Sequence, residues 1–213
     1  MQIAVLTLNG FNEVDSFVAS TMLNRLSPLG WKAYITSPDP EIVSMNGVRV
    51  VRQKPIEFAA EADAVLIGSG IKTRDYAADS AFLSRIALDP CRQLIGAQCS
   101  GTLLLAKLGL LGDLPACTDL ISKPWVVEAG VTIVDAPFVA HGNVATAGGC
   151  LASQYLASWV IARLAGLSVA EEIIRYFAPV GEKKIYAHRA MDIVRPYCLP
   201  SVANDQSTHS TRL

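Results

Sequence analysis

The sequence has few charged residues and no excess of either sign. Charged residues make up 17% of the 213 positions, with 18 Lys and Arg against 19 Asp and Glu, and the formal net charge is −1. Binding to the phosphate backbone of DNA or RNA requires clustered Lys and Arg, and no basic stripe stands out along this chain. The composition therefore argues against a nucleic acid as a partner.

The cysteines show no pairing pattern. There are five, an odd number, and their spacing is irregular without a Cys-x-x-Cys motif: Cys91, Cys99, Cys117, Cys150 and Cys198. Such spacing argues against a disulfide framework and against a zinc site. We therefore expect no metal at these cysteines, and we expect the reducing environment of the cytoplasm.

Long apolar runs are also missing. No run reaches the roughly 18 residues that a membrane-spanning helix needs, so we expect no membrane partner. The chain begins with the strand-like "QIAVLTL" and lacks a basic segment there, which predicts that no signal peptide is present. Hydrophobic residues nevertheless make up 51% of the sequence, enough for one well-buried domain over residues 1–213.

Strand-like and helical segments alternate along the chain. Short apolar runs rich in strand-forming residues predict strands at 2–8, 31–37, 62–70 and 93–98. Apolar residues at helical spacing predict helices at 15–26, 74–87, 100–107, 150–166 and 169–178. This alternation predicts an α/β fold with a doubly wound, mostly parallel sheet flanked by helices.

Turn signals refine this prediction. Asn46-Gly47 between two short strand-like runs predicts a small β-hairpin over residues 42–51. Strand-like runs at 131–149 are separated by a turn at 141–143. Beyond Pro179 the pattern fades, so the predicted core covers residues 2–178, and the polar stretch 201–213 is predicted to be a frayed tail.

In a doubly wound sheet, ligands bind outside the carboxyl ends of the strands. Cys99 lies at such a place, between a predicted strand and a predicted helix, with Gly96 and Gly101 on either side. This arrangement resembles a nucleophile elbow, and a helix N-terminus beside a thiol is expected to lower its pKa. The alternative is that Cys99 is a small buried hydrophobic residue.

Two other strand ends carry candidate site residues. Asp15 follows the first strand, where its carboxyl group could share a proton with a thiol, although capping of the next helix is the preferred interpretation from the residues alone. Gly68-Ser69-Gly70 ends the third strand, where backbone N–H groups could face a ligand as an oxyanion site requires. The alternative for these glycines is a plain tight turn.

The histidines do not suggest a partner for Cys99. None of His141, His188 and His209 follows a predicted core strand near it, so we expect all three to be exposed or structural. The other four cysteines are also predicted to be structural. Among them Cys150, which begins a helix after "TAGG", is the second to test after Cys99.

Four stretches together resemble the ThiJ/PfpI superfamily, the cysteine-dependent branch of the class I glutamine-amidotransferase-like fold. They are "IAVLTLNGFNEVDSFVASTMLNRL", "ADAVLIGSG", "LIGAQCSGTLLLAKLGLLGDLPACTD" and "HGNVATAGGCLASQYLASWVIARLAG". They resemble, in order, the acid-bearing first helix with its strand, half of the oxyanion site, the nucleophile elbow, and the final hairpin with its long helix. The resemblance covers residues 2–178 and implies a single domain of the flavodoxin-like type and a homodimer.

Within this superfamily the sequence is most similar to the isonitrile hydratases. Their pattern of an aspartate after the first strand, a cysteine at the elbow and a threonine after it corresponds here to Asp15, Cys99 and Ser100. The resemblance implies hydration of a small isonitrile to an N-substituted formamide without a cofactor. Cys99 would attack the carbon, Asp15 would handle the proton and activate water, and Ser100 with the N–H groups of Gly70 and Ile71 would hold developing charge.

Two departures from the superfamily leave alternatives open. Many members carry a histidine shortly after the elbow helix, where this sequence has Asp119, and they often have proline and glycine at the positions of Ile67 and Ser69. The missing histidine argues against an amidase or glyoxalase mechanism. A redox-sensing or stress-protective protein with an oxidisable Cys99 is the main alternative, and a ligand-binding regulatory domain ranks lowest.

Overall fold

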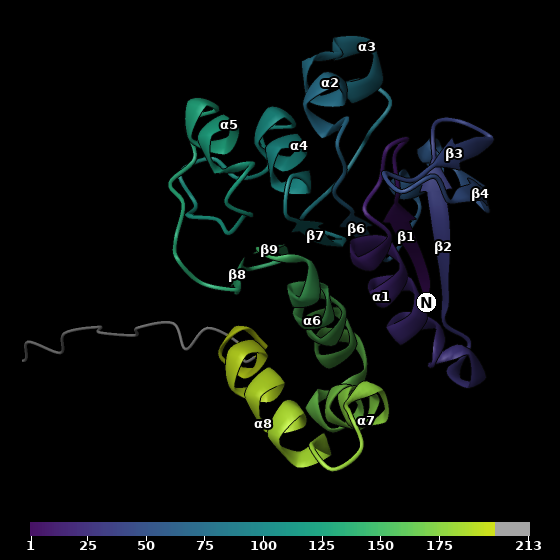
Figure 1. The fold of residues 1–213 in the computed structure, drawn as a ribbon, viewed down its shortest axis with the longest axis vertical. Helices are drawn as coiled ribbons and strands as arrows, with labels where there is room; N and C mark the ends of the chain where they lie inside the picture. The colour runs from purple at the N-terminus through teal and green to yellow at the C-terminus, as the bar shows by residue number, and fades with distance from the viewer. Residues whose placement is uncertain (199–213) are drawn as a thin grey trace, which may run out of the picture.

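A seven-stranded sheet forms the centre of the molecule (Figure 1). The computed structural model describes residues 1–198, so the predicted frayed tail at 201–213 lies outside the described residues. The strand order is β5-β2-β1-β6-β7-β9-β8, and all neighbours are parallel except β8 and β9. The strands are β1 (Gln2–Leu6), β2 (Lys32–Ser37), β5 (Lys54–Pro55), β6 (Ala64–Ile67), β7 (Leu94–Gln98), β8 (Phe138–His141) and β9 (Val144–Ala147). The predicted α/β fold with a mostly parallel sheet is confirmed.

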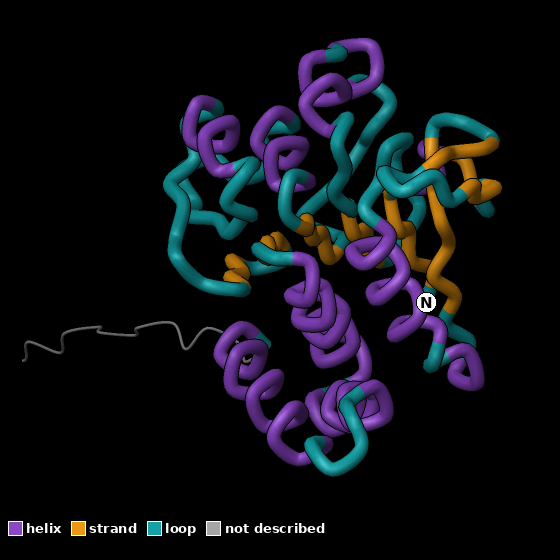
Figure 2. The backbone as a smooth tube through the Cα atoms, viewed as in Figure 1, coloured by secondary structure: helices purple, strands orange, loops and turns teal. Residues whose placement is uncertain are grey.

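Helices cover both faces of this sheet (Figure 2). One layer contains α1 (Glu13–Asn24), α6 (Ser153–Ala165), α7 (Leu167–Phe177) and α8 (Lys183–Val194). The other contains η2 (Ile56–Ala60), α2 (Thr73–Ala78), α3 (Ser80–Leu83), α4 (Gly101–Lys107) and α5 (Lys123–Glu128). Burial on both faces explains why the central strands β6 and β7 are continuous apolar runs rather than alternating patterns.

Short 3₁₀ turns complete the described chain at η1 (Ser27–Leu29), η3 (Cys150–Ala152) and η4 (Arg195–Tyr197). The predicted helix over 150–166 is therefore a 3₁₀ turn followed by α6. Within residues 1–198, no helix combines the length and the apolar character that crossing a membrane would require.

The predicted hairpin is present as β3 (Glu41–Val43) and β4 (Arg49–Val51), which form a separate antiparallel pair. The hairpin and its turn are hydrogen-bonded to the loop between β1 and α1. The Gly10 N–H donates to the Val43 carbonyl at 2.7 Å, and the Met45 N–H donates to the Phe11 carbonyl at 2.8 Å. The hairpin therefore fixes the loop that leads to Asp15.

The predicted helix over 74–87 is divided in two at Asp79. The Asp79 carboxylate accepts hydrogen bonds from the N–H groups of Ala81 at 2.9 Å and Phe82 at 3.1 Å, so it caps α3. Asp side chains prefer such capping positions over helix interiors. The periodic pattern alone could not show this break, because each short helix buries an apolar residue in the same core cluster, Ala77 in α2 and Phe82 in α3.

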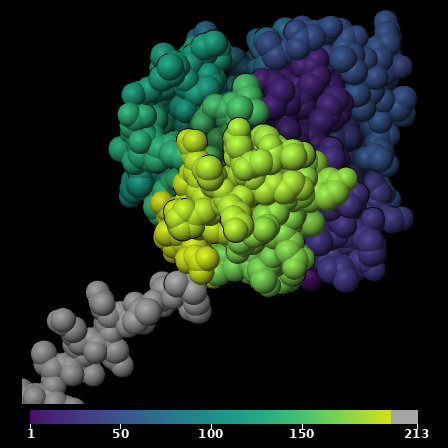
Figure 3. All heavy atoms as spheres, turned by 60° about the horizontal axis from the view of Figure 1, so that its bottom comes forward, coloured from purple at the N-terminus to yellow at the C-terminus, as the bar shows by residue number. Residues whose placement is uncertain are grey.

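Helix α8 extends the packed core beyond the predicted limit at residue 178. Its buried residues are Ala187, Ala190, Met191 and Val194, which join the same apolar cluster as α6 and α7. Figure 3 shows the yellow atoms of this C-terminal region gathered on one face of the molecule. The sequence pattern faded there because two of the four buried residues of α8 are alanines, while the larger apolar residues Ile185 and Tyr186 are exposed.

Candidate active site

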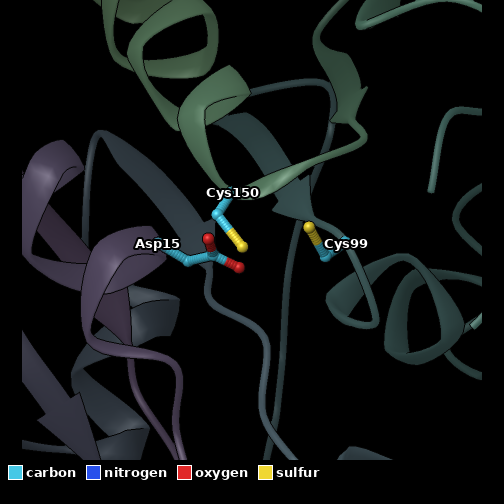
Figure 4. Close-up of side chains that lie close together, drawn as sticks. All are labelled: Asp15, Cys99 and Cys150. Carbon is cyan, nitrogen blue, oxygen red and sulfur yellow. The ribbon is translucent and has the colours of Figure 1, made fainter. Parts of the chain in front are cut away.

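The carboxyl ends of four strands meet at one edge of the sheet. Leu6 of β1 pairs with Ile67 of β6, Ile67 pairs with Ala97 of β7, and Gln98 of β7 pairs with Ala147 of β9. The segments that leave these strands carry Asp15, Ser69, Cys99 and Cys150. Figure 4 shows the side chains of Asp15, Cys99 and Cys150 pointing toward one another from three separate segments.

Cys99 has the backbone conformation of a nucleophile elbow. Its φ is +48°, and among residues 1–198 it is the only residue other than glycine with a positive φ. This left-handed conformation costs an L-residue roughly 1–2 kcal/mol. The strand β9 and the loop after α4 hold it in place, because the Cys99 N–H donates to the Ala147 carbonyl and the Thr118 hydroxyl donates to the Cys99 carbonyl, both at 2.8 Å. A plain core cysteine would not need this conformation.

The two glycines beside Cys99 allow close packing. A Cβ atom at Gly101 would lie 2.8 Å from the carbonyl oxygens of both Ile67 and Gly68. A Cβ atom at Gly96 would lie 2.8 Å from a methyl group of Leu156 on α6. Gly101 therefore lets α4 begin directly against the end of β6, and Gly96 lets α6 pack onto β7.

Asp15 does not cap α1, so the capping interpretation is wrong. Asn12 is the cap, and its side-chain oxygen accepts from the Val14 N–H at 3.0 Å. Asp15 lies in the first turn of α1 with only 2% of its surface exposed. One carboxylate oxygen accepts a short hydrogen bond from the Ser69 hydroxyl, and the other accepts none from the residues that the structure describes. A buried carboxylate with a free oxygen is suited to proton transfer.

Burial raises the pKa of the Asp15 carboxyl to about 6, and the hydrogen bond from the Ser69 hydroxyl opposes this rise. Asp15 can therefore gain or lose a proton near neutral pH.

The Cys99 thiol has a raised pKa, so the expected lowering by the helix N-terminus is wrong. Burial is the main cause, the negative charge of Asp15 adds to it, and a hydrogen bond from the Gln98 amide opposes it. Burial in an apolar surrounding disfavours the thiolate more than the short helix α4 favours it. The resting thiol therefore keeps its proton until a nearby base removes it, and Asp15 is the ionisable carboxylate that lies beside it.

Cys150 belongs to the same cluster, although the sequence predicted a structural role. Asp15, Cys99 and Cys150 each place one oxygen or sulfur atom within 4.8 Å of those of the other two. Cys150 is exposed, and its sulfur accepts a hydrogen bond from the Asn12 amide at 3.1 Å. The available signal was its position directly after β9. The hairpin pattern of β8 and β9 concealed that β9 is parallel to β7 and ends at the same edge.

The predicted oxyanion donors are already engaged within the protein. The Gly70 N–H donates to the Ser100 hydroxyl at 3.1 Å, and the Ile71 N–H donates to the Gly10 carbonyl at 3.0 Å. The Ser100 hydroxyl in turn donates to the Thr73 hydroxyl at 2.9 Å. The predicted oxyanion role of the two N–H groups stays a prediction, and it would require these hydrogen bonds to break. They fasten the loop after β6 to the β1–α1 loop and to Ser100.

A pocket of about 860 Å³ opens above this cluster. Of the predicted site residues, Asp15 and Gly68 do not line it, whereas the other predicted residues do: Ser69, Gly70, Ile71, Cys99 and Ser100. Its walls are mainly apolar, with contributions from Met45, Leu120, Ile121, Trp125, Ile133 and Val134. The pocket therefore suits a small molecule with an apolar group.

No histidine lines this pocket among the described residues. His141 contacts the Pro115 carbonyl through Nε2 at 3.1 Å, and His188 lies 3.2 Å from Asp192 on the exposed side of α8. His209 lies outside the described residues. Asp119, at the place of the histidine in many superfamily members, lines the pocket and accepts from the N–H groups of Ile121 at 2.9 Å and Ser122 at 3.0 Å.

The cluster of Asp15, Cys99 and Cys150 also has the donor types that a metal could use, and it is the one such group found within residues 1–198. Two thiolates and a carboxylate are zinc ligands. Burial raises the pKa of both thiols, which opposes the deprotonation that metal binding needs. The expectation of no metal and no cofactor stays a prediction.

The sequence pattern of the DJ-1/PfpI family matches residues 1–163 of the chain. A comparison with curated proteins found no match to the chain.

Solved structures share the fold. A ThiJ/PfpI family protein from Pseudomonas syringae is 21% identical, with a TM-score of 0.73 over 92% of this chain and 88% of that one. A cysteine-to-alanine mutant of a DJ-1 superfamily protein from Salmonella typhimurium is 24% identical, with a TM-score of 0.69 over 84% of this chain and 98% of that one. DJ-1beta from Drosophila melanogaster is 20% identical, with a TM-score of 0.71 over 83% of this chain and 96% of that one. At these identities the similarity shows the fold alone.

The positive φ at Cys99 predicts that a glycine variant is more stable than an alanine variant at this position, the reverse of the usual order. Glycine adopts this conformation without a Cβ clash, so Cys99→Gly should have an unfolding free energy about 1 kcal/mol higher than Cys99→Ala. At Cys117, which is also buried but lacks a positive φ, alanine should be the more stable variant. Urea denaturation of the four variants measures both differences. An equal preference for alanine at both positions would contradict the strained conformation.

The raised pKa of Asp15 predicts a pH-dependent cost in stability. The folded protein holds this proton up to about pH 6, whereas the ordinary value is 3.8, so stability falls as the pH rises between these values. Asp15→Asn removes this loss. We expect the free energy of unfolding of Asp15→Asn to equal that of the wild type near pH 4. Above pH 7 it should be higher than that of the wild type by on the order of 1–3 kcal/mol.

The matched control is Asp113→Asn, because Asp113 is exposed. In denaturant titrations, the free energy of unfolding of Asp113→Asn should stay close to that of the wild type across the same pH range. If Asp15→Asn is less stable than the wild type at pH 8, Asp15 is stabilised by its partners and the assigned direction is wrong.

Proposed function

The chain belongs to the DJ-1/PfpI family, and from this premise we propose that it is a cysteine-dependent enzyme that hydrates small isonitriles to N-substituted formamides. Cys99 is the nucleophile and Asp15 is the acid and base. The observation that carries this proposal is the strained Cys99 at the pocket, with the buried Asp15 carboxylate within 4.8 Å of its sulfur.

The reaction needs one nucleophile and one group that moves protons in both directions. The terminal carbon of an isonitrile accepts a nucleophile and must then gain a proton. A carboxyl group with a pKa of about 6 can serve as base and as acid near neutral pH. Asp15 and Cys99 supply these two roles, and the pocket needs no histidine for them.

In the first step, Asp15 takes the proton of the Cys99 thiol and the sulfur attacks the terminal isonitrile carbon. A carbon–sulfur bond forms while one carbon–nitrogen bond pair becomes a lone pair on nitrogen, and the carbon keeps the lone pair that it already carries. That carbon then takes the proton back from Asp15. The product is a thioimidate in which Cys99 is bonded to a CH=N–R group, and no proton has been lost.

In the second step, Asp15 takes a proton from water while the water oxygen bonds to the thioimidate carbon. Asp15 then gives this proton to the nitrogen, which has received the electron pair of the carbon–nitrogen π bond. The adduct then loses its hydroxyl proton, forms the carbonyl bond and expels the Cys99 sulfur. Asp15 returns the last proton to the sulfur. The products are R–NH–CHO and the free thiol, so the atoms of one isonitrile and one water are conserved.

Developing charge on oxygen can be stabilised by the N-terminus of α4. The first N–H groups of a helix have no partner within it, and no side chain in the described part of the chain caps α4. The Ser100 N–H follows the nucleophile directly, which is the position of an oxyanion donor in a nucleophile elbow. In the proposed mechanism the Ser100 N–H takes the oxyanion role, because the N–H groups of Gly70 and Ile71 already donate hydrogen bonds within the protein. The Ser100 hydroxyl is a positioning group that holds the loop of Gly70.

The pocket walls favour a neutral, apolar substituent. Ile71, Leu120 and Ile121 line the pocket and expose between 66% and 89% of their surface. Binding an apolar group there removes this surface from water. An isonitrile carries no charge, so its substituent can bind such walls without a salt bridge. The small-molecule substrate, the homodimer and the cytoplasmic location remain predictions.

The proposal predicts conversion of cyclohexyl isocyanide to N-cyclohexylformamide, measured by chromatography of the product. Cys99→Ser and Asp15→Asn should each reduce turnover by on the order of 10²–10⁴ or more, since each removes a group that reacts with substrate or moves its protons. Cys91→Ser is the control, because Cys91 is exposed and does not line the pocket. Turnover should rise with pH through about 6 as Asp15 ionises. A wild-type protein without turnover contradicts the proposal.

A further inference from the structure

The cluster contains a second thiol that the proposed hydration does not use. The Cys150 sulfur lies within 4.8 Å of both the Cys99 sulfur and an Asp15 carboxylate oxygen. Cys150 is exposed, whereas Cys99 is buried beneath the pocket with 3% of its surface exposed. Figure 4 shows the sulfur of Cys150 directed toward the other two side chains. An oxidant that reaches Cys99 therefore produces a reactive sulfur beside a free thiol.

We propose that Cys99 and Cys150 form a reversible disulfide when the protein meets a hydroperoxide. This bond closes the site and protects Cys99 from irreversible oxidation. It rests on the reactivity of Cys99 that the proposed function also needs, but not on the hydration of any substrate.

The chemistry takes two balanced steps. In the first, Asp15 takes the thiol proton, the Cys99 sulfur attacks the outer oxygen of the hydroperoxide, and the oxygen–oxygen bond breaks. The sulfur becomes a sulfenic acid, and the remaining oxygen leaves as water or an alcohol after protonation. In the second, the Cys150 thiolate attacks the Cys99 sulfur, a sulfur–sulfur bond forms, and hydroxide leaves and takes up the Cys150 proton as water. The oxidant gains two electrons, and the two thiols lose them.

The backbone around Cys150 can supply the movement that this bond requires. A disulfide needs its sulfur atoms about 2.0 Å apart. Cys99 is fixed by its hydrogen bonds to Ala147 and Thr118, so Cys150 must approach it. Cys150 begins the short turn η3 and follows Gly149, which has a φ of +88° and open space around it. Among residues 1–198, the Cys150 sulfur has one side-chain hydrogen bond, from Asn12. This bond can break without leaving a buried group unsatisfied, because Asn12 lines the open pocket.

Proximity favours Cys150 over a second molecule of oxidant. A neighbouring group in the same protein reacts at an effective concentration far above that of dissolved hydroperoxide. The other cysteines are not in this cluster. Cys117 is fully buried, and Cys91 is exposed but does not line the pocket. The disulfide should therefore form before Cys99 gains a second oxygen and becomes a sulfinate.

The test treats the reduced protein with a small excess of hydrogen peroxide and then measures its mass. The wild type should lose the mass of two hydrogen atoms and give a non-reduced digest in which the peptides of Cys99 and Cys150 are linked. A thiol reductant should restore the original mass. Cys150→Ser should form no link and should instead gain two oxygen atoms at Cys99 that the reductant does not remove. Cys91→Ser should behave as the wild type.

The same samples are assayed with cyclohexyl isocyanide, so that the two proposals can fail separately. A wild-type protein that links the two cysteines but shows no turnover supports the disulfide and contradicts the hydratase. A wild-type protein that hydrates the isonitrile but gains two oxygen atoms at Cys99, as Cys150→Ser does, overturns the disulfide and leaves the hydratase. A link between Cys99 and any other cysteine also overturns it.

Discussion

The left-handed backbone of Cys99 is the constraint on which the site depends. The end of β9 and the Thr118 hydroxyl hold this residue at a φ of +48°. Gly101 allows α4 to begin at once against the end of β6. Because the conformation is costly for an L-residue, packing of the parallel sheet must compensate for it. The result is a sulfur held at the pocket, where Asp15 from α1 and Cys150 after β9 can reach it.

The proton that Asp15 and Cys99 can share is the second feature of the site. Burial raises the pKa of both groups, and the negative charge of Asp15 adds to the rise at the thiol. The pair therefore rests as a thiol beside a carboxyl group that titrates near neutral pH, rather than as a preformed thiolate. Reactivity then depends on proton transfer from Cys99 to Asp15 when an electrophile is bound. Burying an ionisable carboxyl group lowers stability at neutral pH, a common feature of functional sites.

The sequence predicted the parallel sheet, the hairpin and the position of Cys99 because these follow from apolar runs, turn residues and strand–helix order. It predicted Asp15 as a partner for Cys99, but it did not predict that Cys150 joins them. The capping role expected of Asp15 belongs to Asn12, which lies three residues earlier. Cys150 was missed because strand direction is a tertiary property, and only the parallel pairing of β9 with β7 brings it to the site. The raised pKa of Cys99 depends on burial, and half of the buried residues of α8 are alanines, which carry little periodic signal.

The most direct test of the shared proton is the rate of Cys99 alkylation by iodoacetamide as a function of pH. Peptide mass spectrometry distinguishes this cysteine from the other four. In the wild type, the rate should rise through about pH 6 as Asp15 ionises and begins to act as the base. In Asp15→Asn this step should disappear, and the rate should rise only at alkaline pH as the thiol ionises alone. Identical profiles for the two proteins would contradict the account, because they would show that Asp15 does not control the Cys99 proton.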